Sequence, residues 1–228
     1  MLSDIKKIQI FIIFFLSVIT CDLKAWDFFV YHTSDVLPEI SVKSIKPFDL
    51  YESKIKTFFF KTQEMPCSFY SGKISVSYSK LKQVSGIDNR VYIFVVPGEF
   101  SGKGGQLKKA DGEIVRYVFV RENCSAAEFC HELCHAIAGL GDEYGGNPAA
   151  YPENMRKAKG KTVYPNLTWY ENDFYEWKDI VDTKKYFSGG VGYDNGIFHA
   201  YENCLMKDLS QPLCPICCFY LQKALEKY

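Results

Sequence analysis

Three stretches near the middle of the chain have the apolar patterns of β-strands. Residues 90–98, RVYIFVVPG, are continuously apolar from Val91 to Val96, as in a strand buried on both faces. Residues 113–123, EIVRYVFVREN, are β-branched and aromatic and predict a second strand, while residues 72–81, GKISVSYSKL, alternate like a half-buried one. Residues 98–113, GEFSGKGGQLKKADGE, lack phosphate-loop spacing, and their glycines predict a loop.

The segment before these strands, residues 26–66, contains short aromatic runs such as FFVYH and TFFF. Pro38 and Pro47 interrupt it, so the pattern predicts short strands and loops. Nothing in this segment indicates a function.

A helix is predicted for residues 126–138. Ser125 and Glu128 form a capping-box pattern, which makes Glu128 a structural residue, and an apolar-periodic run follows to Ala138. Gly139 can adopt the left-handed conformation that ends a helix.

The amino terminus has the pattern of a secretory signal. Lys6 and Lys7 precede an apolar run, residues 8–19, that is short of the roughly 20 residues needed to cross a bilayer. Cleavage after Thr20 or Ala25 would release the mature chain, and a lipid-modified Cys21 is the runner-up, the only case in which we expect membrane attachment. A buried helix or a membrane anchor is the alternative. We therefore expect export, to the medium, the periplasm or the cell surface.

Composition describes a soluble, folded protein without a nucleic-acid partner. Of 228 residues, 47% are hydrophobic and 24% charged, and 27 basic residues balance 27 acidic ones. The lysine pairs are scattered and lack interleaved aromatic residues, unlike a nucleic-acid interface.

Export changes the interpretation of the nine cysteines, because thiols in an oxidising compartment usually pair. Eight remain without Cys21, and we expect disulfides among them, including one between Cys204 and the cluster at residues 214–218. A second zinc site in CPICC is the rival interpretation. Adjacent Cys217 and Cys218 point different ways, so a tetrahedron of four cysteines would be strained. The eight are Cys67, Cys124, Cys130, Cys134, Cys204, Cys214, Cys217 and Cys218.

The predicted helix carries the motif HExxH. His131 and His135 lie one turn apart on one face and can share a metal ion, while Glu132 lies beside them. Imidazole ligands with one position left for water favour zinc, and Glu132 would act as general base toward a zinc-activated water. The alternative is an exposed histidine pair on an ordinary helix.

Two histidines need a third protein ligand, which we expect from the residues after Gly139. The segment has the form HExxHxxxGxxD, one residue longer than the metzincin spacing, and Asp142 takes its last position. Because adjacent residues of an extended turn point apart, Glu143 should then face away from the ion. A small shift in the turn would present Glu143 instead.

The segment HELCHAIAGLGDEY resembles the active-site segment of the bacterial IgA metallopeptidase family, a metzincin-like group of zinc peptidases. Further stretches between Gly72 and Lys223 agree with that family: YIFVVPGEFSGKGG, PNLTWY, FSGGVGYDNGIFHAYENCLM and LCPIC. The resemblance implies a zincin fold of α+β class, in which a twisted mixed sheet packs on the active-site helix and the C-terminal part is cysteine-rich. By position it implies His131, His135 and Asp142 as metal ligands, Glu132 as base and Met206 beneath the metal.

The resulting hypothesis is an exported, monomeric zinc endopeptidase that holds one Zn²⁺ and cleaves protein or peptide substrates. Its expected parts are a signal peptide (1–25), a segment of unclear role (26–66) and a zincin-like metallopeptidase domain (67–228). The alternatives are a degenerate zincin fold and a zinc-stabilised binding module.

Substrate contacts are less defined. The strand EIVRYVFV is expected at the sheet edge, where extended substrate could pair with it. Candidates to polarise the scissile carbonyl, each more simply a packed core residue, are Tyr144, Tyr193, Tyr201 and His199.

Overall fold

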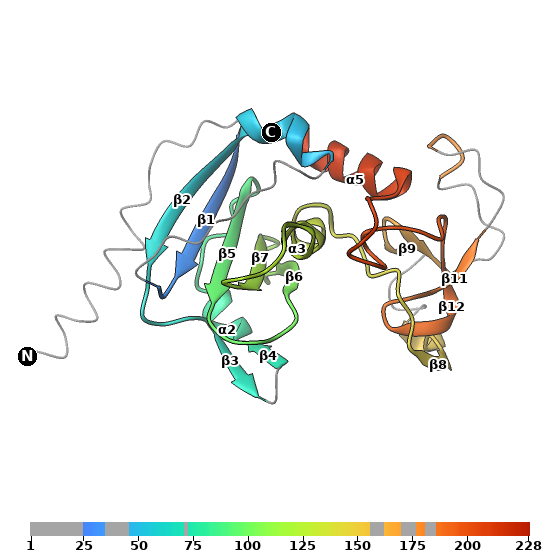
Figure 1. Ribbon diagram of the computed structural model, residues 1–228, viewed down its shortest axis with the longest axis horizontal. Helices are drawn as coiled ribbons and strands as arrows, with labels where there is room; N and C mark the ends of the chain where they lie inside the picture. Colours follow the sequence, from blue (N-terminus) through green and yellow to red (C-terminus); the bar gives the residue numbers. More distant parts are fainter. Residues whose placement is uncertain (1–24, 35–45, 71–72, 156–161, 170–176, 181–185) are drawn as a thin grey trace, which may run out of the picture.

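The computed structural model describes residues 25–34, 46–70, 73–155, 162–169, 177–180 and 186–228 (Figure 1). The predicted signal peptide lies outside these residues, apart from Ala25. Within the described residues no helix is both long and apolar enough to cross a membrane. The chain is α+β, with a mixed sheet as its largest element.

The elements follow one another along the chain in this order: β1 (Trp26–His32), η1 (Phe48–Lys54), β2 (Ile55–Lys61), β3 (Cys67–Tyr70), β4 (Lys73–Val76), α2 (Tyr78–Leu81), β5 (Arg90–Val96), β6 (Lys103–Lys108), β7 (Ile114–Arg121), α3 (Ala126–Ala138), β8 (Asn147–Ala150), β9 (Thr162–Tyr164), β10 (Leu167–Thr168), β11 (Phe187–Gly190), β12 (Tyr193–His199) and α5 (Pro215–Leu225).

The main sheet has the strand order β2-β1-β5-β7-β6, with β6 antiparallel to its parallel neighbours. Strand β5 shows why the apolar run is continuous. Val91, Ile93 and Val95 belong to the core beneath α3 and α5, whereas the alternate residues Tyr92 and Phe94 face the second core, toward β4 and α2. A strand covered on both faces needs apolar residues at every position. The predicted strands at 90–98 and 113–123 are therefore confirmed as β5 and β7.

Residues 26–66, whose role the sequence left open, supply β1 and β2 to this sheet, and β1 lies between β2 and β5. Trp26 is buried, and its indole Nε1–H donates to the Leu225 carbonyl near the carboxyl terminus (3.3 Å). This segment is thus part of the same folded body as the later residues.

Three local predictions were wrong in whole or in part. Residues 103–108 form strand β6 rather than a loop, and this strand, not β7, forms the sheet edge, because β7 is paired on both sides. Glycine lowers strand propensity but serves here for close packing: a Cβ on Gly104 would overlap the backbone of Glu132 in α3. The alternating stretch 72–81 is divided between β4 and the short helix α2.

The strands that follow α3 in the chain, β8 to β12, form a second, smaller part on the other side of α3 from the main sheet (Figure 1). Strands β11, β12, β10 and β9 form one sheet, in which β8 also pairs with β12. Helix α5 packs against α3, and its buried residues join the core beneath the main sheet. The cleft described below is lined by residues of α3, β6 and this second part.

Candidate metal centre and cleft

Helix α3 begins and ends where its sequence predicted. The Ser125 hydroxyl accepts a hydrogen bond from the Glu128 N–H (3.1 Å), and Gly139 ends the helix with a left-handed φ of 64°. Glu128 is structural, as expected, since its carboxylate accepts from Arg121 (2.9 Å) and from the Gly102 N–H (3.3 Å). The contact with Gly102 ties the start of α3 to the chain that enters β6.

The structure brings His131, His135 and Asp142 together. Asp142 Oδ1 lies 3.0 Å from His131 Nε2 and 3.1 Å from His135 Nε2, and the two Nε2 atoms are 3.1 Å apart. Tetrahedral zinc with bonds of about 2.0 Å separates such ligand atoms by about 3.3 Å. The three residues therefore form a triangle of nearly the size that one metal ion requires.

Hydrogen bonds on the far side of each imidazole define its tautomer. His131 Nδ1 lies 3.0 Å from the Leu205 carbonyl and His135 Nδ1 lies 2.6 Å from the Leu140 carbonyl. A carbonyl only accepts, so each Nδ1 carries the proton and each Nε2 directs a lone pair at Asp142. Three acceptor atoms at this distance repel one another unless a cation or protons lie between them.

Charge interactions in the triangle agree with this geometry. Burial alone would raise the pKa of Asp142, but once His131 and His135 are protonated their Nε2–H groups donate to its carboxylate and hold that pKa well below its usual range. Conversely, burial would lower the pKa of His135, and the Asp142 carboxylate raises it. The carboxylate is thus kept in the anionic form that binds metal.

Glu132 lies beside the triangle in a cleft of about 580 Å³. Burial raises the pKa of its carboxyl group, although His135 and His131 oppose that shift. A raised pKa suits a group that must take up and release a proton near neutral pH. The cleft is lined by Gly102, Lys103, Gly104, Gly105, Gln106, Tyr117, His131, Glu132, His135, Gly139, Leu140, Gly141, Asp142, Tyr144, Tyr164 and Val191.

Strand β6 forms one wall of this cleft and, in the described part of the chain, pairs only with β7. Its residues Gly104 and Gly105 let the strand lie close to its neighbours, because a Cβ would overlap the Glu132 backbone at Gly104 and would crowd the Tyr117 hydroxyl at Gly105. Gln106 fastens the strand to α3, since its Nε2 donates to the Ala136 carbonyl (3.0 Å). The edge available to an extended peptide is therefore β6.

Of the four residues considered for carbonyl polarisation, only Tyr144 lines the cleft. Burial and the neighbouring Asp142 carboxylate raise the pKa of Tyr144 to about 12, so its hydroxyl stays protonated and can donate. His199 is buried with its Nδ1 on the Tyr201 carbonyl (2.7 Å), and Tyr193 packs edge-on against Tyr151. Tyr117 and Tyr164 also line the cleft, and no pattern in the sequence had marked either of them as a candidate to polarise the carbonyl.

Asn166 positions the turn that carries Asp142. Its side-chain oxygen accepts from the Gly141 N–H (2.8 Å), while its amide group donates to the Gly141 carbonyl (2.8 Å) and to Glu143 Oε1 (2.9 Å). The sequence analysis assigned no role to Asn166, which appeared only within the family-like stretch PNLTWY. Asn166 is buried, so its side chain serves packing and hydrogen bonding instead.

The chain at Leu205 and Met206 contacts both the turn that carries Asp142 and the ligand histidine His131. Met206 is fully buried, its carbonyl accepts from the Glu143 N–H (2.8 Å), and the preceding Leu205 carbonyl faces His131. These contacts bring residues 205–206 against both the helix and the turn, in keeping with the position that the family resemblance implies for Met206.

The predicted disulfide framework is not present in the structure. Every cysteine among the described residues is a free thiol. Cys130 and Cys134 are buried in α3, and Cys204, Cys214 and Cys217 lie together next to Glu143. The expected grouping of Cys204 with the C-terminal cysteines is therefore found in space, but without a bond.

Comparison with protein-family models and with curated proteins gives no match for this chain. The functional argument therefore depends on the residues and on their geometry.

Proposed function

We propose that this protein is an exported zinc-dependent endopeptidase of the zincin type, similar to the bacterial IgA metallopeptidases. His131, His135 and Asp142 would hold one zinc ion and Glu132 would act as general base. The observation that carries this proposal is the convergence of three lone-pair atoms within 3.1 Å of one another in an open cleft, with a buried glutamate beside them.

The donor set fits zinc. Two neutral imidazoles and one carboxylate are the ligand types of hydrolytic zinc sites, which keep a position open for water or substrate. Zinc held there supplies a Lewis acid that lowers the pKa of water from 15.7 to about 7. The position of the triangle at the floor of the cleft leaves room for such a water and for a peptide carbonyl.

The chain's own residues account for the other steps. Glu132 accepts the proton of the attacking water and returns it to the amine of the leaving product. The hydroxyl of Tyr144, held protonated beside Asp142, donates to the carbonyl oxygen on which negative charge develops. An extended substrate pairs its backbone with β6, which orients the scissile bond without reading most side chains.

A zinc-stabilised binding module is the alternative, and the exposure of the Asp142 side chain to the cleft argues against it. A structural zinc is enclosed by four protein ligands and needs no adjacent carboxylate such as Glu132. Asp142 has 24% of its side chain exposed to the cleft, and Glu132 lies in that cleft unused as a ligand.

The direct test measures zinc and cleavage together. The purified protein is screened against a complex peptide mixture, with and without a chelator, and compared with His135→Ala. We expect cleavage by the native protein alone, and its return when zinc is added back after chelation. Native protein that holds zinc at this site yet cleaves nothing would favour the binding module, and cleavage that survives His135→Ala would place the catalytic centre elsewhere.

A further inference from the structure

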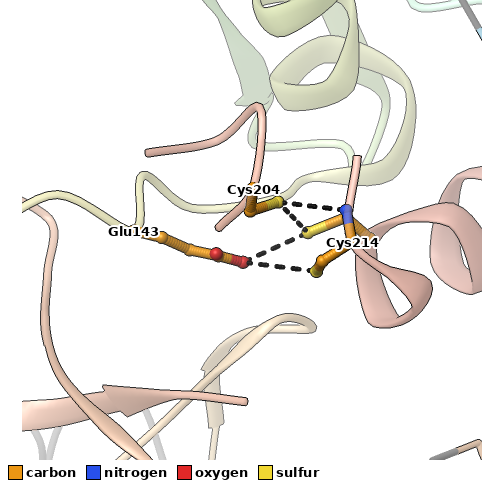
Figure 2. Close-up of side chains that lie close together, drawn as sticks. Glu143, Cys204 and Cys214 are labelled. Atoms are coloured by element: carbon orange, nitrogen blue, oxygen red, sulfur yellow. Dashed lines mark hydrogen bonds between the residues drawn. The ribbon is translucent and has the colours of Figure 1, made fainter. Parts of the chain in front are cut away.

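A second group of metal-binding side chains lies behind the turn that carries Asp142. We call Glu143, Cys204, Cys214 and Cys217 the thiol cluster. Their ligand atoms all lie within 4.8 Å of one another, and all four residues are buried. Figure 2 shows Glu143 extending from one side toward Cys204 and Cys214 on the other.

The local fold explains why these residues meet. Cys214 is the residue that precedes α5, and Cys217 lies in the first turn of that helix, so the spacing CPIC directs both sulfurs to one side. Cys204 belongs to the loop between β12 and α5, and the Cys214 N–H donates to its sulfur (3.3 Å). Glu143 enters from the opposite side, after the turn at Gly141.

Distances within the cluster match a shared ion better than a disulfide. The sulfurs of Cys204 and Cys217 are 3.6 Å apart, whereas a disulfide needs about 2.05 Å. Two thiolates on tetrahedral zinc, with bonds of about 2.3 Å, lie about 3.8 Å apart, and a thiolate and a carboxylate oxygen about 3.5 Å apart. Glu143 Oε1 lies 3.2 Å from the Cys217 sulfur and 4.0 Å from the Cys214 sulfur, so the two distances fall on either side of the value for a thiolate and a carboxylate oxygen.

The burial of Glu143 needs an explanation that its protein neighbours do not supply. Its side chain is 1% exposed, and its Oε2 has no hydrogen-bond partner in the described part of the chain. Among those residues no lysine or arginine forms an ion pair with it. His199 Nδ1 lies 3.6 Å from Oε2 but donates to the Tyr201 carbonyl instead. A buried carboxylate without a cation is costly.

We propose that Glu143, Cys204, Cys214 and Cys217 bind a second metal ion, zinc, in a closed site with a structural role. The site has the four protein ligands of structural zinc, three of them thiolates, and no position is left for substrate. Cys218, the neighbour of Cys217, is not a ligand, because its sulfur lies against the Leu213 carbonyl (3.6 Å). The carboxylate of Glu143 thus takes the place that Cys218 would have in a site of four cysteines.

The surroundings stabilise the negative charge of three thiolates and one carboxylate around a divalent ion. The Cys214 N–H donates to the Cys204 sulfur, and the Asn166 amide donates to Glu143 Oε1 (2.9 Å). Cys214 and Cys217 lie at the amino-terminal end of α5, where the positive end of the helix dipole favours negatively charged thiolates.

The second ion would fix the first site in place. Asp142 and Glu143 are consecutive, so an ion held by Glu143 anchors the turn that presents Asp142 to the cleft. It also joins that turn to α5 and to the chain before Met206, whose carbonyl accepts from the Glu143 N–H. This role does not depend on peptidase activity.

The test counts and identifies the metal in the purified, reduced protein. We expect two zinc ions per native chain and one in His131→Ala, with the remaining ion bound by sulfur at about 2.3 Å in X-ray absorption spectra. Replacing zinc with cobalt(II) should give the near-ultraviolet absorption of thiolate-bound cobalt in the native protein and in His131→Ala alike.

The two adjacent cysteines of α5 provide a matched pair. Cys217→Ser should lose the thiolate-to-cobalt absorption and one zinc, whereas Cys218→Ser should keep both. If Cys217→Ser does not fold, thiol alkylation of the native protein, mapped by peptide analysis, decides: Cys204, Cys214 and Cys217 should react only after a chelator is added, whereas the partly exposed Cys218 should react without it. Native zinc bound by nitrogen and oxygen alone, reaction of Cys204, Cys214 and Cys217 without chelator, or a disulfide at Cys204 would each overturn the proposal.

Discussion

Asp142 and Glu143 are neighbours in the chain, yet their side chains enter two clusters of opposite character. Asp142 joins His131 and His135 at the floor of the cleft, with 24% of its side chain exposed, whereas Glu143 is 1% exposed among three thiols. The first cluster has three ligands, and the second has four. One turn thus supplies a ligand to an open site and a ligand to a closed one.

In the scheme we propose, the fold keeps a catalytic metal site apart from a structural one. Hydrolytic zinc needs a free coordination position and a nearby base, and only the open cluster has the cleft and Glu132. Structural zinc needs complete enclosure, and only the thiol cluster lies wholly among buried residues. The predictions below separate the two sites, beginning with the largest expected effect.

Glu132→Gln should slow cleavage by about 10²- to 10⁴-fold, because glutamine cannot accept the proton of the attacking water. The metal content should remain at the native value, since Glu132 is not a ligand in either cluster. Steady-state rates on a cleaved peptide, together with zinc analysis, measure both.

Glu128→Gln is the matched control for that variant. Glu128 lies one turn earlier on α3 and is also buried, but it does not line the cleft, and its carboxylate accepts hydrogen bonds from Arg121 and from the Gly102 N–H. It should lower stability and leave turnover within a few fold. Equal losses of rate in the two variants would remove Glu132 from the chemistry.

Asp142→Asn should weaken the open site and spare the thiol cluster, whereas Glu143→Gln should weaken the thiol cluster directly and the open site by a smaller amount, because the second ion anchors the turn that carries Asp142. Loss of a direct ligand should lower zinc affinity by more than the 10- to 100-fold typical of outer hydrogen-bond partners. Asp142→Asn should abolish cleavage but keep the thiolate-to-cobalt absorption, and Glu143→Gln should weaken that absorption. A loss of absorption in Asp142→Asn with none in Glu143→Gln would exchange the two assignments.

The sequence was most informative where a pattern lies within one element. The helix with its cap at Ser125 and its end at Gly139 was predicted correctly, because capping and left-handed glycine are local effects. Strands β5 and β7 were also predicted, since burial on both faces leaves a continuous apolar run.

What the sequence missed depends on contacts between distant residues. The glycines of β6 predicted a loop because glycine has low strand propensity. In the structure, close packing against the backbone of α3 requires glycine at Gly104. The thiol cluster was judged unfavourable because only cysteines were counted, and no local signal assigns Glu143, some 70 residues earlier, to Cys204, Cys214 and Cys217. The role of Asn166 was also missed, because its hydrogen-bond partners Gly141 and Glu143 lie more than 20 residues earlier in the chain.

Asn166→Ala should affect both sites by a smaller amount. Its side chain holds the turn by two hydrogen bonds to Gly141 and one to Glu143. Removing them leaves buried polar groups unsatisfied, at a cost of about 1–3 kcal/mol, and should lower zinc affinity at each site by about 10- to 100-fold. Metal titrations that show a change at one site alone would mean that the turn does not couple them.

Ser125→Ala should have the smallest effect and should leave both sites intact. The Ser125 hydroxyl caps α3 by accepting from the Glu128 N–H, so its loss should cost about 1 kcal/mol and lower Tm by about 2–4 °C. Zinc stoichiometry should stay native, because the cap lies at the end of α3 away from His135 and contacts neither cluster. Ser125→Asp, which retains a capping oxygen, should restore Tm. Thermal unfolding that is unchanged in Ser125→Ala would show that the cap adds nothing to this helix, whereas lost zinc would show that the open site depends on the whole length of α3.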